Sequence, residues 1–176
     1  MQVGDRAGAE AAFGESLMLA RERGDSLGIA HATGDLGLLA VHAGRLAEAS
    51  SLLHESASLF RELGDRFALP YTVLSLAELL LALERPADSA LLLGAVSAYL
   101  EASEGNVQAY ATEQTERARR AARSALGTDH YDEREALGRD LTLAQAVEQW
   151  LAQSSSSLAS DSSSLSSSPA GARSTP

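Results

Sequence analysis

The chain repeats itself at an interval of forty residues, and this internal repeat restricts the possible folds more than any other feature. The segment GDRAGAEAAFGESLMLARERGD at 4–25 aligns with GRLAEASSLLHESASLFRELGD at 44–65. A weaker third copy pairs Leu36 with Leu76. Repeats of this length are typical of stacked supersecondary units, in which each unit buries its apolar face against the next one.

Each repeat unit predicts two helices. In the second unit, one face of a helix carries Leu52, Leu53, Ser56, Leu59, Phe60 and Leu63 at helical spacing. Gly64 supplies the left-handed residue with which helices commonly end, and Asp65 can accept hydrogen bonds from the first N–H groups of the next helix. The shared Gly-Asp ending therefore indicates that one helix stops and another starts.

The same signals place the remaining helices. They are predicted over 26–42, 67–84, 107–126 and 128–137. Pro86 suits the first turn of a further helix, because its missing N–H costs little there. Gly127 ends the long helix after the period is lost, and Thr142 with Gln145 forms a capping box that starts the last helix, within 138–151.

The predicted fold is all-α: an α-solenoid of helix pairs, with about seven helices and a C-terminal helical cap. The predicted parts are a truncated first repeat (1–25, second helix only), two repeats (26–105), the cap (106–153) and a Ser-rich disordered tail (154–176). The tail has too few apolar side chains to offset the entropy of ordering. The predicted core includes Leu53, Leu59, Leu76, Leu80 and Leu92.

The first helix has no preceding partner in this sequence. We expect its outer apolar face, with Phe13 and Leu17, to be exposed and to favour self-association. A repeat protein normally starts with a whole unit or a cap, so this start indicates a fragment, a split gene or a truncated gene model.

Composition narrows the function classes. The formal net charge of −10 argues against a non-specific nucleic-acid surface, which needs clustered positive charge. The chain has no cysteine, which excludes disulfides and thiolate-ligated metals. Its most apolar stretch, at 73–83, is interrupted by Glu78 and is too short to span a bilayer, and no signal peptide is visible. The sequence predicts a soluble, cytoplasmic protein.

The repeat resembles the tetratricopeptide repeat. Leu36-Gly37 fits the Leu-Gly of the first helix in that family, and the Gly, apolar, Ala and apolar positions of the second helix are filled by Gly44, Leu46, Ala49 and Leu53. The usual unit has about 34 residues, so this one is longer. HEAT-type repeats have a similar length, but the small-residue pattern favours the tetratricopeptide interpretation.

The C-terminal half resembles the end of large bacterial ATPase-type regulators. In these proteins a tetratricopeptide array follows a P-loop ATPase and is paired with a LuxR-type domain, a winged helix or a cyclase domain. The matching segments in this chain are Ala90–Ala95, Ala125–Gly127 and Gly138–Val147. The sequence has no P-loop, helix-turn-helix or cyclase motif, so the resemblance implies that those domains lie upstream.

In the tetratricopeptide family, ligands bind in a groove lined by the first helices of the repeats. The matching positions are His31, Leu38, Val41, His42, Tyr71, Leu74, Glu78 and Leu81. Such a groove suits a peptide or protein partner or a small polar inducer, although ordinary packing would also explain these residues. The resemblance implies no cofactor.

Two further clusters have simple structural explanations. The run Asp129-His130-Tyr131-Asp132-Glu133 resembles a metal or acid–base cluster, but acids are favoured at a helix start and no second ligand group accompanies it. The arginines around Arg120 could suggest phosphate binding. Glu113 and Glu116 precede Arg117 and Arg120 by four residues, which predicts pairs within the helix.

No nucleophile–base or metal constellation is visible, so the sequence does not predict an enzyme. The leading hypothesis is a non-catalytic sensor or interaction module of a bacterial regulator. The alternative is a free-standing adaptor that binds a protein or peptide in its groove. An in-frame P-loop encoded upstream would favour the first hypothesis, and a promoter there would favour the second.

Overall fold

The computed structural model describes residues 3–65, 67–103 and 109–164, and this part of the chain is all-α. Its eight helices are α1 (Val3–Arg23), α2 (Ser26–His42), α3 (Leu46–Leu63), α4 (Leu69–Ala82), α5 (Pro86–Ala102), α6 (Ala109–Leu126), α7 (Thr128–Arg139) and α8 (Leu143–Ser164). The predicted all-α class is confirmed, with eight helices in place of about seven. No described helix is long and apolar enough to cross a membrane.

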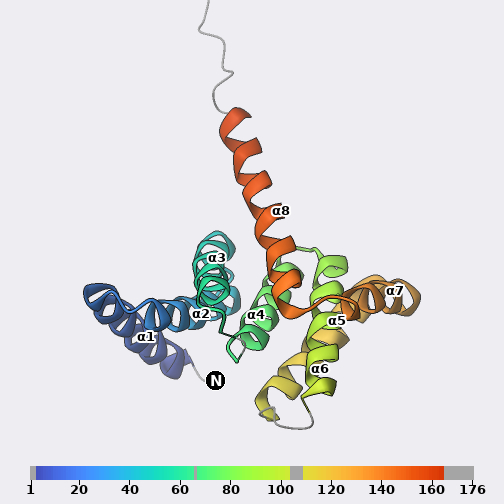
Figure 1. Cartoon of the computed structure of the whole chain (residues 1–176), viewed down its shortest axis with the longest axis horizontal. Helices are drawn as coiled ribbons and strands as arrows, with labels where there is room; N and C mark the ends of the chain where they lie inside the picture. The colour runs from blue at the N-terminus through green and yellow to red at the C-terminus, as the bar shows by residue number, and fades with distance from the viewer. Residues whose placement is uncertain (1–2, 66, 104–108, 165–176) are drawn as a thin grey trace, which may run out of the picture.

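Helices that follow one another in sequence pack together from α1 to α7 (Figure 1). Three further contacts link alternate helices, because α2 also packs against α4, α4 against α6 and α5 against α7. We call the surface formed by α2, α4 and α6 the inner face. α7 packs mainly on α5, while the start of α8 lies against α3, α4 and α5.

The first four helices end in the same way, at intervals of twenty residues. The residues with positive φ are Gly24 (65°), Gly44 (74°), Gly64 (65°) and Glu84 (57°). At each position the next residue donates its N–H to a carbonyl in the last turn, for example Asp65 to Phe60 at 3.1 Å. Asp25 and Asp65 then accept hydrogen bonds from the N–H groups of Gly28 and Ala68, as the Gly-Asp repeat predicted.

Glu84 is the one described non-glycine residue with positive φ. We expect Glu84→Gly to stabilise the fold by about 0.5–1 kcal/mol, because glycine adopts this conformation without a steric penalty. The repeat supplies the matched control at Gly44, where Gly44→Ala should destabilise by about 1 kcal/mol. Urea denaturation of both variants measures the two effects. A loss of stability in Glu84→Gly together with a gain in Gly44→Ala would contradict the assigned helix ends.

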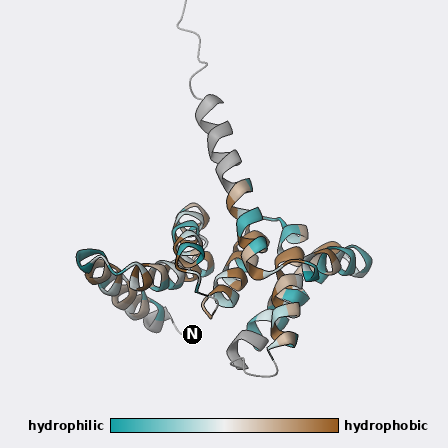
Figure 2. Ribbon diagram, viewed as in Figure 1, coloured by the Kyte–Doolittle hydropathy of each residue, from teal (hydrophilic) through white to brown (hydrophobic). Residues whose placement is uncertain are grey.

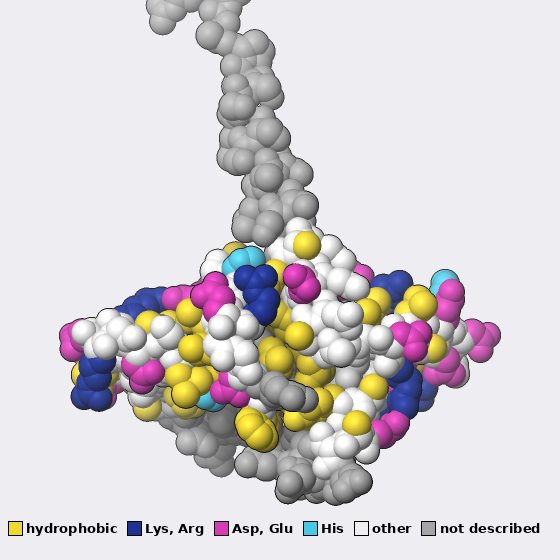
Figure 3. Space-filling model, viewed as in Figure 1, with side chains coloured by type: hydrophobic (Ala, Val, Ile, Leu, Met, Phe, Trp, Pro, Cys, Tyr) yellow, Lys and Arg dark blue, Asp and Glu magenta, His cyan; other side chains and the backbone are white. Residues whose placement is uncertain are grey.

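The core lies between the helices, and α4 is apolar nearly all round (Figure 2). Leu53, Leu76, Leu80 and Leu92 are buried, as predicted. Leu59 is half-buried at the edge of the same core. Exposed apolar side chains gather near the middle of the face seen in Figure 3, whereas many of the charged side chains lie toward its two ends.

The prediction for the first helix is wrong at Leu17, which is buried. The large apolar side chains of α1 that remain exposed are Met18 (52%) and Leu19 (37%), while Phe13 is half-buried. The sequence could not choose between these faces, since that choice depends on the angle at which α2 crosses α1.

Several helix boundaries differ from the sequence predictions, since α4 ends two residues earlier and α7 two residues later than predicted. α4 starts two residues later than predicted, after a turn in which Asp65 also accepts a hydrogen bond from the N–H of Phe67. α8 continues to Ser164 and so enters the segment 154–176 that composition predicted to be disordered. Serine is tolerated in a helix that an upstream capping box has already started. Residues 165–176 lie outside the described part.

α5 and α7 approach each other closely at two glycines. A Cβ atom added at Gly94 would lie 2.1 Å from the carbonyl oxygen of Glu135, and one added at Gly138 would lie 1.9 Å from that of Leu91. The two glycines allow the backbones of the two helices to touch.

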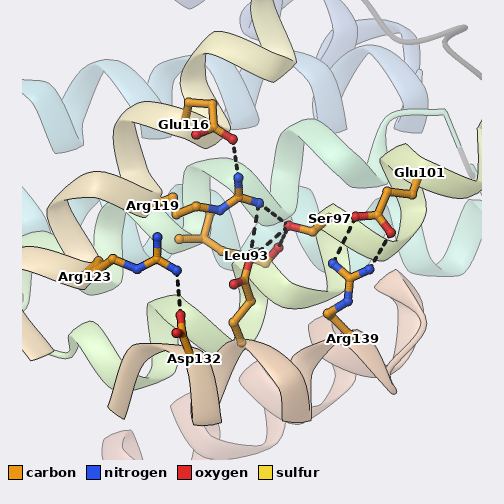
Figure 4. A network of polar contacts seen from close by, with 9 residues as sticks. Leu93, Ser97, Glu101, Glu116, Arg119, Arg123, Asp132 and Arg139 are labelled. Carbon is orange, nitrogen blue, oxygen red and sulfur yellow. Dashed lines mark hydrogen bonds and ion pairs between the residues drawn. The ribbon is translucent and has the colours of Figure 1, made fainter. Parts of the chain in front are cut away.

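Arginines of α6 tie this closing region together (Figure 4). The Nη2 atom of Arg119 lies 2.6 Å from Ser97 Oγ on α5 and 3.2 Å from Glu135 Oε1 on α7. Arg123 pairs with Asp132 on α7 at 2.5 Å. Glu116 pairs within its own helix, as predicted, but its partner is Arg119 in place of Arg120. Most of these arginines link helices to one another.

Candidate functional site

A pocket of about 180 Å³ opens on the inner face between α2 and α4. We call it the inner pocket. It is lined by His31, Gly34, Asp35, Leu38, Phe60, Ala68, Tyr71, Thr72, Ser75 and Gln114. These residues come from α2, α3, α4 and α6 and from the end of the turn before α4. The pocket therefore exists because alternate helices contact one another.

The structure divides the eight predicted groove residues into three sets. His31, Leu38 and Tyr71 line the inner pocket. Val41 and Leu74 are buried in the core, and Leu81 is half-buried against it. His42 and Glu78 lie apart from the pocket lining and contact each other.

Glu78 is the centre of a polar cluster that joins the three inner helices. Its Oε2 lies 2.7 Å from His42 Nε2 on α2, and its Oε1 accepts hydrogen bonds from Gln114 (3.1 Å) and Arg117 (2.7 Å) on α6. The side chain is only 11% exposed. Burial alone would raise the pKa of Glu78, but the hydrogen bonds from Arg117, His42 and Gln114 outweigh it and hold the pKa below 4.5, its ordinary value.

A lowered pKa makes the contribution of Glu78 to stability depend on pH. The carboxylate stabilises the folded state at pH values above its unfolded pKa, and this contribution is lost as the pH falls through the lower folded-state pKa. We expect Glu78→Gln to reduce the free energy of unfolding at neutral pH by about 1–3 kcal/mol, because it removes the negative charge and replaces one of the two acceptor oxygens with an amide NH2 donor.

Urea denaturation of this variant and the native chain at neutral pH and at about pH 3 measures the effect. The difference between them should shrink at the lower pH, because the contribution of the carboxylate is lost progressively below its unfolded-state pKa. Glu62→Gln is the matched control, because Glu62 is exposed and has no partner among the described residues. A difference for Glu78→Gln that stays constant with pH would contradict the lowered pKa.

A second hollow, of about 410 Å³, lies between α1 and α2. Its lining includes Ala20, Gly28, His31, Ala32 and Asp35, which a shift of forty residues places on Phe60, Ala68, Tyr71, Thr72 and Ser75 of the inner pocket. The two hollows therefore occupy equivalent positions in successive repeat units. His31 and Asp35 border both of them, so these two residues lie between the two hollows.

Sequence reasoning missed Asp35, Phe60, Ser75 and Gln114. Asp35 follows His31 by four residues and occupies the position equivalent to Ser75, so helical spacing and the repeat could have identified both. The helical spacing of α3 places Phe60 in the core, where it is indeed 3% exposed. Gln114 could not be found, because nothing local predicts that α6 crosses α4 at this point.

The cluster at 129–133 is divided by the fold. Tyr131 is fully buried, with Arg123 4.6 Å above its ring, and burial raises the pKa of its phenol to about 12. Asp132 pairs with Arg123, whereas His130 and Glu133 border a shallow surface hollow. Within the described residues, no group of three or more histidines and carboxylates could hold a metal ion.

No model of a protein family, no curated protein and no solved structure matches the chain. The chain is an all-α protein whose helices pack largely with their sequence neighbours and carry a pocket on the face of alternate helices.

Proposed function

We propose that the chain is a non-catalytic interaction or sensor module of the tetratricopeptide type, belonging to a bacterial ATPase-type signalling or transcriptional regulator. Its partner or inducer binds in the inner pocket. The observation that carries this proposal is that the inner pocket and the hollow beside it occupy equivalent positions of successive repeat units, on the face made by alternate helices.

The small residues at the crossing of α2 and α3 support the tetratricopeptide assignment. A Cβ atom added at Gly37 would lie 2.7 Å from the side chain of Leu53, and Ala49 is fully buried. These residues occupy the Gly, Ala and large apolar positions of the family pattern. The family pattern thus accounts for the close approach of these two helices at Gly37.

The hydroxyl groups of the pocket favour binding over catalysis. Thr72 and Ser75 donate their protons to the carbonyl oxygens of Ala68 and Tyr71, at 3.3 and 3.1 Å. A catalytic hydroxyl instead donates to a general base that activates it as a nucleophile. The pocket thus offers recognition groups held in place by helix backbones.

A thermal-shift screen of peptides and polar metabolites tests the proposal. A ligand that binds only the folded chain raises its melting temperature. Leu38→Trp fills the inner pocket and should abolish the shifts, whereas Leu137→Trp adds the same bulk on the exposed surface of α7 and should preserve them. Hits that stabilise both variants equally, or a screen in which Leu137→Trp alone loses binding, would contradict it.

The regulator assignment has a separate test in the genomic sequence. A P-loop ATPase encoded in frame upstream supports it, and a promoter directly upstream contradicts it. The binding proposal for the inner pocket does not depend on that result.

A further inference from the structure

The inner pocket has one fixed charge, which lies on the solvent-exposed carboxylate of Asp35. Asp35 is the one acidic or basic side chain among the residues that line the pocket, apart from the imidazole of His31. No hydrogen bond or ion pair joins its carboxylate to another described residue. Partial desolvation raises the pKa of Asp35, and His31 opposes this effect. A positively charged ligand would balance the negative charge of the Asp35 carboxylate.

The remaining polar atoms of the pocket present mainly acceptors. Thr72 and Ser75 have committed their hydroxyl protons to backbone carbonyl oxygens, and the Nε2 atom of Gln114 donates to Glu78 at 3.1 Å. What these groups can still offer a ligand is hydroxyl lone pairs, an amide oxygen and one remaining amide N–H. A ligand rich in donors fits such a lining better than one rich in acceptors.

Aromatic rings complete the lining. The rings of His31 and Phe60 meet edge to face with their centroids 4.9 Å apart, and Tyr71 stands one helix away on α4. Aromatic faces attract cations, and a guanidinium group both stacks on rings and forms paired hydrogen bonds with a carboxylate.

The volume of the inner pocket limits the size of the ligand that it can hold. About 180 Å³ is less than the ~300–1,000 Å³ of pockets that hold drug-sized ligands. The space suits a single side chain or a small head group.

We propose that the inner pocket binds a guanidinium group, held by the Asp35 carboxylate and by the rings of Tyr71 and Phe60. The group belongs either to an arginine side chain of a partner peptide or to a free guanidino compound. This inference rests on the proposed function, since it names the ligand class of the same pocket.

Titrations followed by NMR of the labelled full-length chain test the inference. The free probe is N-acetylarginine amide, and the peptide probe is an alanine pentapeptide with a central arginine. For each probe, the citrulline analogue keeps the shape and removes the charge. We expect saturable shifts of the Gly34 and Ser75 amides with both arginine probes, and affinities at least about tenfold weaker with citrulline. A tighter peptide identifies a protein partner, whereas equal affinities identify a free guanidino compound.

Asp35→Asn should weaken the binding of the arginine probes by about tenfold or more, because the substitution removes the charge of this side chain and keeps its shape. Glu148→Gln removes the same charge from the exposed surface of α8 and should leave binding unchanged. Thermal unfolding of both variants confirms that they fold. Equal binding of arginine and citrulline, or equal losses in the two variants, overturns the guanidinium inference.

The outcomes separate this inference from the proposed function. If neutral or anionic compounds bind the inner pocket and arginine probes do not, the guanidinium inference fails and the binding function stands. If no compound in the broad screen or in these titrations perturbs the inner face, both fail.

Discussion

Gly94→Ala is expected to destabilise the fold by about 3 kcal/mol or more, at the upper end of the usual cost of overpacking. The added methyl group would lie 2.1 Å from the carbonyl oxygen of Glu135 and 3.0 Å from the backbone nitrogen of Arg139. These are backbone atoms of a helix, so no rotamer change relieves the clash. α7 would have to move away from α5, which would disturb the ion pairs of Arg119 with Glu135 and of Arg139 with Glu101.

Gly138→Ala should behave in the same way, because its methyl group would lie 1.9 Å from the carbonyl oxygen of Leu91. Gly14→Ala is the matched control. No atom lies within 4 Å of a Cβ atom added there, and alanine is the better helix former by about 0.5–1 kcal/mol. Urea denaturation should therefore give opposite signs for the two sites. Equal stability of Gly94→Ala and the native chain would mean that α5 and α7 are not in backbone contact.

Leu53→Ala is expected to destabilise by about 2–5 kcal/mol, from lost burial and from the cavity that the truncation leaves. Leu53 is fully buried where α3 crosses α2. Its side chain packs so closely on Gly37 that a Cβ atom added there would clash with it. Leu63→Ala, at the end of the same helix, is the control, because Leu63 is 46% exposed and should cost about 1 kcal/mol or less. A smaller effect at Leu53 than at Leu63 would mean that α3 turns its other face to α2.

Features encoded locally were predictable from the sequence. The Gly-Asp endings identified helix ends, and the capping box at Thr142 and Gln145 forms both of its predicted hydrogen bonds, at 2.9 and 3.2 Å. The leucine spacing identified four of the five named core residues. In each case the information lies within a few residues of the feature it predicts.

Features that depend on the crossing of distant helices were not predictable. Arg119 bonds with Glu135 and Ser97 on other helices, and Leu17 is buried because of the way α2 crosses α1. For the same reason the groove residues predicted from a family pattern divide between pocket, core and the Glu78 cluster. Helical spacing determines which residues share one face of a helix. Only tertiary packing determines which other helix, or solvent, that face contacts.

NMR mapping of the hits from the thermal-shift screen tests ligand binding at the inner pocket most directly. We expect saturable amide shifts centred on Gly34, Ser75 and Gln114, which belong to the three helices of the inner face. The single tryptophan, Trp150 on α8, does not line the inner pocket, and its indole signal serves as an internal control that should not move. Saturable shifts centred on Trp150 and α7, with the amides of Gly34 and Ser75 unchanged, would contradict binding at the inner pocket.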